Sequence, residues 1–157
     1  MFIGGNKMSR ITDITVVDQS AYYALVIRKT INFMNEFQEF SAQGYAKIMD
    51  YIKSKNTFAG GAPIVCFHNM DLEKLDIEIG FPIATKMDGV DNIQCIEIPS
   101  QKIVTAIDQG PYELQDPTLE ELFAWINSSP YKMIGDIYYQ YLNTPNRPAS
   151  EYLTKMI

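Results

Sequence analysis

The alternation of apolar and polar residues predicts four strands in the first half of the chain. β-Branched and aromatic residues fill 11–17 and 22–30, and the turn-forming residues between these two runs predict a strand pair. A shorter run of the same kind covers 64–68. Residues 75–81 alternate strictly between apolar and polar, which is typical of a strand with one buried face.

A helix is predicted between the second and third of these strands. Asn35 is its expected N-cap because Gln38 follows three residues later, and Gly60-Gly61 is its expected end. The apolar residues of this segment recur at spacings of three to five, which is the pattern of an amphipathic helix. The residues of this stripe are Phe37, Phe40, Tyr45, Ile48, Met49 and Ile52.

The second half of the chain repeats this order. Strands are predicted at 93–98 and 102–108, and again at 134–142 and 152–157. The segment Thr118-Leu119-Glu120-Glu121 between them has the form of a capping box, in which Thr118 and Glu121 each satisfy a backbone N–H of the other. It predicts a short helix with one apolar face.

A constant offset of 74 residues connects the two halves and indicates an internal duplication. We therefore expect one domain over 9–157, with repeat one at about 9–83, repeat two at about 92–157 and a flexible leader over 1–8. The residues related by this offset are Ile48 and Leu122, Met49 and Phe123, Tyr51 and Trp125, Ile52 and Ile126, Gly61 and Gly135, Phe67 and Tyr141, and Asn69 and Asn143.

These elements predict an α+β fold made of a duplicated βαββ unit. Two amphipathic helices cannot cover both faces of an eight-stranded antiparallel sheet. We therefore expect both helices on one face of a curved sheet, and a ligand cleft between the repeats.

Composition narrows the function classes. The chain has 13 basic and 19 acidic side chains, and its net charge of −6 repels phosphate backbones and anionic membrane surfaces. We therefore expect neither a direct nucleic-acid partner nor a membrane partner. Only two cysteines occur, without CxxC spacing, and the chain contains no apolar run of membrane-spanning length, which predicts a cytoplasmic protein.

Aromatic residues are the unusual part of the composition. Ten Tyr, eight Phe and one Trp make up 12% of the chain. A tyrosine combines a large apolar ring with a polar tip, which suits a cleft that is partly open to water. Most of these rings are expected to fill the core, and a minority to line a site.

The order of elements and three short motifs resemble the GyrI-like small-molecule-binding domains. The motifs are Gly110-Pro111-Tyr112 before the second helix, Trp125-Ile126 near its end, and 141–145 followed by Leu153-Thr154. This family is bacterial and includes stand-alone proteins and the effector domains of multidrug-responsive transcription activators, and its fold is similar to the SOUL haem-binding fold. The resemblance covers residues 9–157. It implies an aromatic cleft between the repeats that binds bulky hydrophobic compounds, including cationic ones.

The chain departs from the family where relatives carry their charge. The family's functional glutamate corresponds to Tyr139, and Lys155 follows Thr154 where a further acid is expected. Tyrosine is a poor general base at neutral pH, so this departure weakens the case for catalysis. By the resemblance and the strand alternation, the expected ligand-binding residues are Phe67, Glu78, Tyr112, Trp125, Ile137, Tyr139 and Tyr141.

Several of these residues also have a purely structural interpretation. Glu78 is either a partner for a cation or for Arg28, or a solvated carboxylate, and the helical spacing of Trp125 also fits core packing. Cys66 and His68 share one face of a strand, which the repeat places beneath the helix. One His and two Cys cannot complete a zinc site without several carboxylates, so we expect no metal, no cofactor and no catalytic residue.

The sequence therefore favours a non-enzymatic sensor or sequestering protein for hydrophobic small molecules, connected with transcription regulation or with a multidrug response. A separate transcription factor or gyrase is a possible protein partner. The alternatives are a hydrolase of electrophilic cyclopropane-type toxins that uses Glu78, a protein-interaction module such as a gyrase inhibitor, and a haem carrier with His68, the only histidine.

Overall fold

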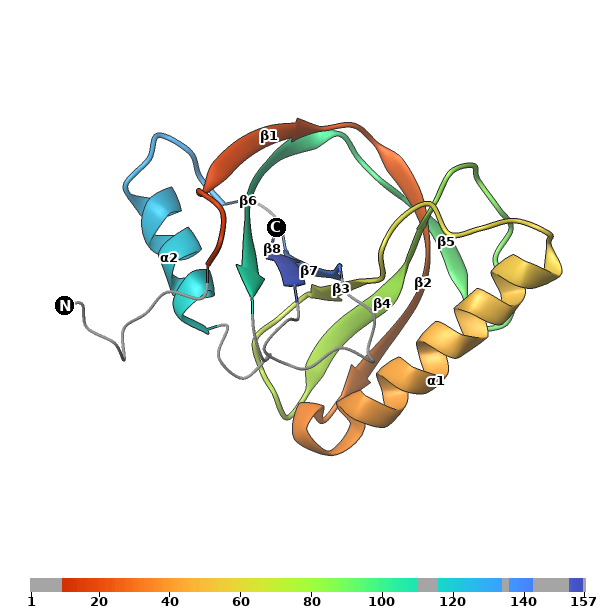
Figure 1. Ribbon diagram of the computed structural model, residues 1–157. Helices are drawn as coiled ribbons and strands as arrows, with labels where there is room; N and C mark the ends of the chain where they lie inside the picture. The colour runs from red at the N-terminus through yellow and green to blue at the C-terminus, as the bar shows by residue number, and fades with distance from the viewer. Residues whose placement is uncertain (1–9, 110–115, 134–135, 143–152, 157) are drawn as a thin grey trace. The chain divides into compact units, whose positions relative to one another are not determined.

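The computed structural model describes residues 10–109, 116–133, 136–142 and 153–156, which form two helices and eight strands (Figure 1). Their order is the same in both halves of the chain, with two strands on each side of the helix. The mixed α+β fold with antiparallel strands is confirmed, and each βαββ unit carries one additional leading strand. The elements are β1 Thr15–Gln19, β2 Tyr22–Ile31, α1 Phe33–Ser54, β3 Ile64–Phe67, β4 Leu75–Ile83, β5 Gln94–Ile98, β6 Gln101–Gln109, α2 Asp116–Asn127, β7 Ile137–Tyr141 and β8 Leu153–Met156.

Contacts between Cα atoms divide the chain into two compact units. The larger unit comprises Gln19–Gln101 and Asp136–Gln140, and the smaller unit comprises the described parts of Met1–Asp18, Lys102–Gly135 and Tyr141–Ile157. The larger unit therefore contains most of the first repeat together with β5 and β7 of the second.

The larger unit is built on five strands in the order β7-β3-β4-β2-β5. Every neighbouring pair is antiparallel. The longest pairing joins β2 to β4 and runs from Tyr23 opposite Ile83 to Ile31 opposite Leu75. Because β4 is paired on both sides, its strict alternation produces two buried but chemically different faces.

In the smaller unit the strand order is β1-β6-β8, and β6 pairs with β8 in antiparallel register. Each strand has a counterpart in the other repeat: β4 corresponds to β8, β2 to β6 and β5 to β1. The run β4-β2-β5 of the larger unit therefore corresponds to β8-β6-β1. This is the strand order of the smaller unit, read from the other end. The two repeats therefore build the same three-strand arrangement by exchanging their first strands.

Helix α1 begins three residues earlier than the sequence predicts. Asn32 is the N-cap, and its side-chain oxygen accepts a hydrogen bond from the backbone N–H of Asn35 at 3.2 Å. The carboxylate of Glu36 accepts the N–H of Asn32 at 2.6 Å, which completes a reciprocal cap. The helix ends at Ser54 rather than at Gly60 because Asn56 adopts a φ of 56°, a left-handed conformation that asparagine tolerates.

Gly44 allows α1 to lie close to the sheet. A Cβ atom at this position would stand 2.5 Å from Cδ1 of Ile79 on β4 and 3.7 Å from Cδ1 of Ile27 on β2. Ile48 and Ile52, on the same side of the helix, are fully buried. The face of the larger unit's sheet that carries Ile27 and Ile79 is therefore the face that α1 covers.

Helix α2 in the smaller unit begins before the predicted capping box. Thr118 lies inside the helix, where it is 1% exposed, and its hydroxyl donates to Oδ1 of Asp108 at 2.6 Å. Glu121 pairs with Arg10 at 3.2 Å. The prediction of a Thr118–Glu121 capping box is therefore wrong, because both side chains find partners outside the helix. Among the described residues, no helix is long and apolar enough to cross a membrane.

Candidate functional site

The strand register of the larger unit sorts its side chains onto two faces, since residues directly opposite each other in a ladder point to the same side. We call the side that α1 covers the helix face, and the other side the opposite face. The helix face carries Leu25, Ile27, Val65, Phe67, Ile77, Ile79, Phe81, Ile137 and Tyr139. The opposite face carries Tyr22, Ala24, Val26, Arg28, Ile64, Cys66, Asp76, Glu78, Ile96, Ile98 and Tyr138.

Three of the predicted ligand-binding residues lie together on the helix face. Phe67 on β3 and Tyr139 on β7 make an edge-to-face contact, with ring centroids 5.4 Å apart and an interplanar angle of 73°. Ile137 lies directly opposite Phe67 in the ladder and is 8% exposed. Both rings are only half-buried. We call Phe67, Ile137 and Tyr139 the aromatic surface.

Helix α1 lies beside this surface, on β4, which is next to β3, and on β2 beyond it. Its Tyr45 packs edge-to-face against Phe81 of β4, with centroids 5.4 Å apart, and its hydroxyl donates to the backbone oxygen of Ile64 on β3 at 2.7 Å. Tyr45 therefore ties the helix to the strand that carries Phe67. The sequence places Tyr45 in the apolar stripe of the helix but does not predict its contact with β3. The spacing of apolar residues carries no information about a hydrogen bond from a side chain to the backbone of a distant strand.

The remaining aromatic predictions fall outside this group. Tyr141 ends β7, is half-buried and belongs to the smaller unit, so its place beside Phe67 stays a prediction. Trp125 of α2 stacks on Tyr131 within the smaller unit, with centroids 6.2 Å apart. Tyr112 lies outside the described residues.

Glu78 is on the opposite face, away from Phe67 and Tyr139. It stands across the ladder from Cys66 on one side and from Arg28 on the other. The expectation that Cys66 lies beneath the helix is wrong, because its neighbour Val65, opposite Ile79, takes that side. Arg28 bonds to Asp76 rather than to Glu78, through two hydrogen bonds of 2.9 and 2.7 Å that hold the pKa of the Asp76 carboxyl below its usual value.

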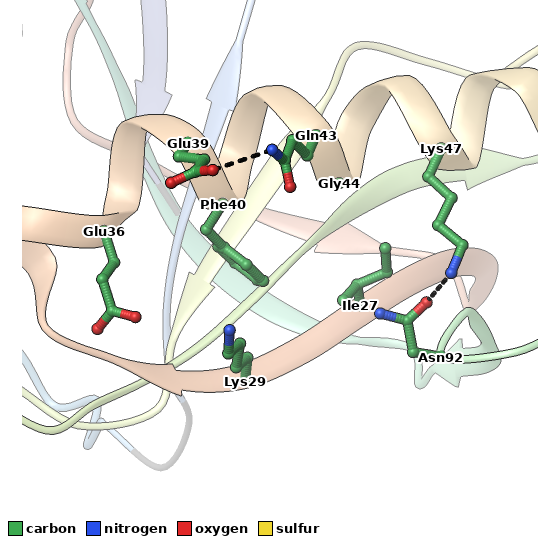
Figure 2. A pocket seen from close by; sticks show the side chains of 9 residues that line it. All are labelled: Ile27, Lys29, Glu36, Glu39, Phe40, Gln43, Gly44, Lys47 and Asn92. Carbon is green, nitrogen blue, oxygen red and sulfur yellow. Dashed lines mark hydrogen bonds between the residues drawn. The ribbon is translucent and has the colours of Figure 1, made fainter.

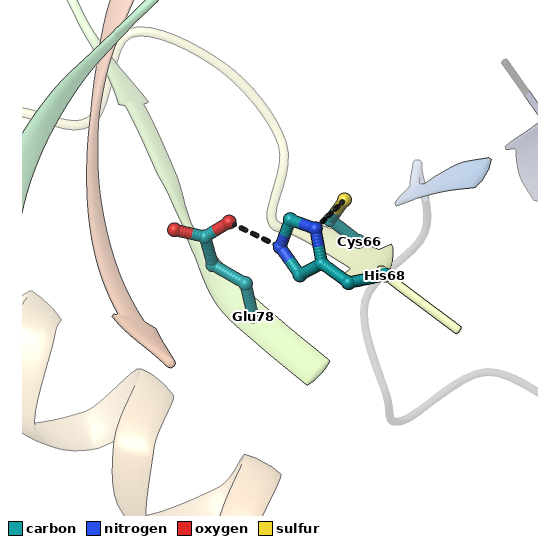
Figure 3. A group of neighbouring side chains, drawn as sticks. All are labelled: Cys66, His68 and Glu78. Atoms are coloured by element: carbon teal, nitrogen blue, oxygen red, sulfur yellow. Dashed lines mark hydrogen bonds and ion pairs between the residues drawn. The ribbon is translucent and has the colours of Figure 1, made fainter. Parts of the chain in front are cut away.

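A polar cluster of four side chains occupies the opposite face (Figure 3 shows three of them). Nε2 of His68 lies 2.8 Å from Oε1 of Glu78, and Nδ1 lies 2.8 Å from Oδ2 of Asp136. Sγ of Cys66 is 4.0 Å from the same Nδ1. The exposed fraction of the side chain is 8% for Glu78, 15% for His68 and 43% for Asp136, so the cluster opens to solvent on the side of Asp136.

Burial determines the chemistry of the thiol in this cluster. Cys66 is 1% exposed, and loss of water around it raises the pKa of its thiol from 9.0 to about 12. Burial also raises the pKa of Tyr138, the residue directly across the ladder from Cys66, above its usual value. Cys66 therefore stays protonated at neutral pH, and the chain on its own does not prepare it as a nucleophile.

A group of apolar side chains lies on the same face as the polar cluster. Ala24, Val26, Ile64 and Ile98 form a buried group, against which Tyr22, Ile96 and Tyr138 pack. Because the side chains of Glu78 and His68 are only 8% and 15% exposed, water weakens charge–charge interactions and coordination bonds there only a little.

A separate pocket of about 410 Å³ lies between α1, β2 and the loop before β5 (Figure 2). Lys47 donates to the side-chain oxygen of Asn92 at 2.5 Å across it, and Gln43 donates to Glu39 at 3.1 Å along the helix. The pocket is lined by Ile27, Lys29, Glu36, Glu39, Phe40, Gln43, Gly44, Lys47 and Asn92. Sequence analysis did not find it, because its lining joins residues that are distant in the chain and carry mixed charge.

The sequence matches the family of GyrI-like small-molecule-binding domains over residues 12–157. No curated protein matches the chain.

Solved structures show the same fold at low sequence identity. The C-terminal domain of EcmrR superposes with a TM-score of 0.76 and 14% identity, over 92% of this chain and 94% of that one. In the EcmrR–DNA complex, this chain covers only 55% of the EcmrR chain. A hydrolase from Listeria innocua superposes with a TM-score of 0.63 and 13% identity, over 98% and 93% of the two chains. SAV2435 bound to tetraphenylphosphonium superposes with a TM-score of 0.58 and 12% identity, over 92% of each.

Proposed function

Because this chain belongs to the GyrI-like family of small-molecule-binding domains, we propose that it binds bulky hydrophobic compounds, including lipophilic cations, on the aromatic surface of the larger unit. The observation that supports this proposal is the half-buried, edge-to-face pair of Phe67 and Tyr139 beside α1. Two half-buried aromatic rings on adjacent strands retain apolar area that a flat ligand can bury.

The surface favours cations through its rings and through the charge of the whole chain. The faces of an aromatic ring carry partial negative charge and its edge partial positive charge, so a cation is attracted to the face. A net charge of −6 also raises the local concentration of cations. Phe67, Ile137 and Tyr139, the residues that make up this surface, include no carboxylate, and Glu78 points to the opposite face. The affinity for a cationic compound should therefore exceed the affinity for a neutral compound of the same shape only modestly.

This expectation can be tested by titrating the purified chain with two probes of similar shape, tetraphenylphosphonium and neutral triphenylphosphine oxide, by calorimetry. Both should bind saturably at one site. The cation should bind more tightly by no more than about tenfold, because a partly exposed cation–π contact contributes about 1 kcal/mol. Absence of saturable binding for both probes would contradict the proposed function. A preference for the cation of a hundredfold or more would instead indicate a carboxylate at the site.

The proposed role is that of a ligand sensor or sequestering protein that acts in a drug or toxin response. Support comes from the fold shared with the C-terminal domain of EcmrR and with SAV2435 bound to tetraphenylphosphonium. If the chain is a sensor, a separate protein such as a transcription factor carries the response, because the negative net charge disfavours direct contact with DNA.

A hydrolase that uses Glu78 is the second candidate, and the fold shared with the Listeria hydrolase supports it. The carboxylate is buried and bonded to His68, which could hold or pass on a proton. Its position on the opposite face separates it from Phe67 and Tyr139, so the same bound compound could not use both. Turnover of an activated cyclopropane that is lost in Glu78→Gln would favour this second candidate over binding alone.

A further inference from the structure

The polar cluster contains the set of ligand types that a transition metal requires. Sγ of Cys66, one ring nitrogen of His68 and a carboxylate oxygen of Glu78 all lie within 4.8 Å of one another. Asp136 adds a second carboxylate, 2.8 Å from the imidazole. The sequence alone argued against a metal because one His and two Cys need several carboxylates to complete a site. The fold supplies two, from β4 and from the residue just before β7.

The two nitrogens of His68 have different neighbours, and this difference assigns their roles. A metal-bound histidine uses one nitrogen for the ion and usually donates the N–H of the other to a carboxylate. Nε2 faces Glu78, which is 7% exposed and held in the middle of β4. Nδ1 faces both the thiol of Cys66 and the carboxylate of Asp136. Nδ1 is therefore the nitrogen that can share an ion with two further ligands.

The distances at Nδ1 are close to those of a coordination sphere. In a tetrahedral zinc site a sulfur and a nitrogen ligand are about 3.6 Å apart, and a nitrogen and an oxygen ligand are about 3.4 Å apart. Here the corresponding separations are 4.0 Å for Sγ of Cys66 and 2.8 Å for Oδ2 of Asp136. Movements of about half an ångström, within the freedom of side-chain torsions, would bring both pairs to these values.

We propose that Cys66 Sγ, His68 Nδ1 and the carboxylate of Asp136 bind a divalent transition-metal ion of the zinc class, while Glu78 accepts the Nε2–H of His68 and orients the ring. Sulfur, imidazole and carboxylate together suit such an ion, whereas Mg²⁺ and Ca²⁺ prefer oxygen ligands only. On binding, the Sγ–H bond breaks, the sulfur keeps the electron pair for the metal, and the proton leaves to solvent.

The exposure of the ligands indicates how the ion would enter the site, and the number of ligands indicates how its coordination would be completed. Asp136 is the most exposed member of the cluster, at 43% of its side chain, so the ion would enter from its side. Three protein ligands leave one position of a tetrahedral ion for water or for a small ligand. This site lies on the opposite face from Phe67 and Tyr139. It is therefore independent of the proposed binding of hydrophobic compounds.

The test is a titration of the full, metal-free chain with Zn²⁺ in competition with a chromophoric chelator, and with Co²⁺ monitored by absorption. We expect one equivalent of each ion to bind. Co²⁺ should give the thiolate-to-metal charge-transfer band in the near ultraviolet together with the visible bands of a four-coordinate ion. The absence of stoichiometric binding, or a Co²⁺ spectrum without thiolate absorption, would overturn the proposal.

Variants assign the ligands. Asp136→Asn, at a partly exposed position, should keep the fold and weaken Zn²⁺ binding by at least about tenfold, and Cys66→Ser should remove the charge-transfer band. The matched controls are Cys95→Ser, which changes the other cysteine, and Asp76→Asn, which changes a carboxylate bonded to Arg28. Neither control should alter binding more than about twofold. Loss of the band in Cys95→Ser, or unchanged affinity in Asp136→Asn, would show that the ion binds elsewhere.

Discussion

Replacing Gly80 by alanine should destabilise the larger unit by about 3 kcal/mol or more, which is a large part of the total stability of a small domain. Gly80 lies in the middle of β4, between β3 and β2. A Cβ atom there would collide with the backbone oxygen of Leu25, and it would stand 2.7 Å from Cγ1 of Val26. Because Leu25 is fully buried in β2, its backbone cannot move away without breaking the β2–β4 ladder. Urea unfolding of the wild type and the variant measures the loss.

Gly61→Ala is the matched control for this change. Its new methyl group would meet only side chains, the nearest being Cγ of Pro82 at 3.3 Å. We expect the free energy of unfolding to change by less than about 1 kcal/mol, since these side-chain atoms can shift. Equal stability of Gly80→Ala and Gly61→Ala would show that β2 and β4 do not pack as closely as the structure describes.

Removing the His68 ring should cost about 3 kcal/mol of stability at neutral pH. His68→Leu would leave the buried carboxylate of Glu78 without the nitrogen that now lies 2.8 Å away. A buried charge that loses its partner is strongly destabilising, whereas a neutral group of the same shape costs much less. Denaturant unfolding of metal-free protein at pH 7 measures the effect.

The second substitution Glu78→Gln provides the control for this prediction. In the His68→Leu background it should recover at least half of the lost stability, because it removes the unpaired charge and keeps the volume. Glu78→Gln alone should cost less than His68→Leu alone. If the double variant were less stable than His68→Leu, the loss would come from packing of the ring rather than from the buried carboxylate.

The order of the elements was predictable because each depends on local periodicity. Strict alternation over 75–81 and the apolar stripe of the first helix both correspond to observed elements, β4 and α1. The predicted start of α1 is three residues late because Asn32 and Asn35 both suit an N-cap. Only the structure shows that the side-chain oxygen of Asn32 accepts the capping hydrogen bond. The end was misplaced because a left-handed asparagine can stop a helix as well as a glycine.

The faces of the sheet were harder to predict. Alternation separates Cys66 from Phe67, but it does not say which of them α1 covers, because that depends on the packing of Gly44 against Ile79. The 74-residue offset relates Phe67 to Tyr141, yet antiparallel pairing of β3 with β7 places Phe67 opposite Ile137 and beside Tyr139. A constant offset shows which residues occupy equivalent positions in the two repeats, and it does not show which residues contact each other.

The polar cluster could not be predicted from local patterns. His68 and Asp136 are 68 residues apart and come from different repeats, and only the β3–β7 pairing brings them together. Cys66 and His68 were recognisable as a pair at i and i+2 on one strand face, but their two carboxylates were not. Such long-range contacts follow from topology, which one sequence specifies only indirectly.

The most direct test of the proposed ligand site compares two neighbouring tyrosines that point to different faces. Tyr139 belongs to the aromatic surface, and Tyr138 packs against the apolar group on the opposite face. Tyr139→Leu and Tyr138→Leu are the same substitution on one strand, and thermal unfolding first establishes that both variants are folded. Calorimetric titration with tetraphenylphosphonium then gives the affinities.

If ligands bind on the aromatic surface, Tyr139→Leu should weaken tetraphenylphosphonium at least about fivefold, since a lost aromatic contact costs about 1 kcal/mol. Tyr138→Leu should change the affinity less than about twofold, because its ring faces the opposite side of the sheet. The reverse order, with Tyr138→Leu impaired and Tyr139→Leu unchanged, would contradict the proposed site and move it to the face that holds Glu78.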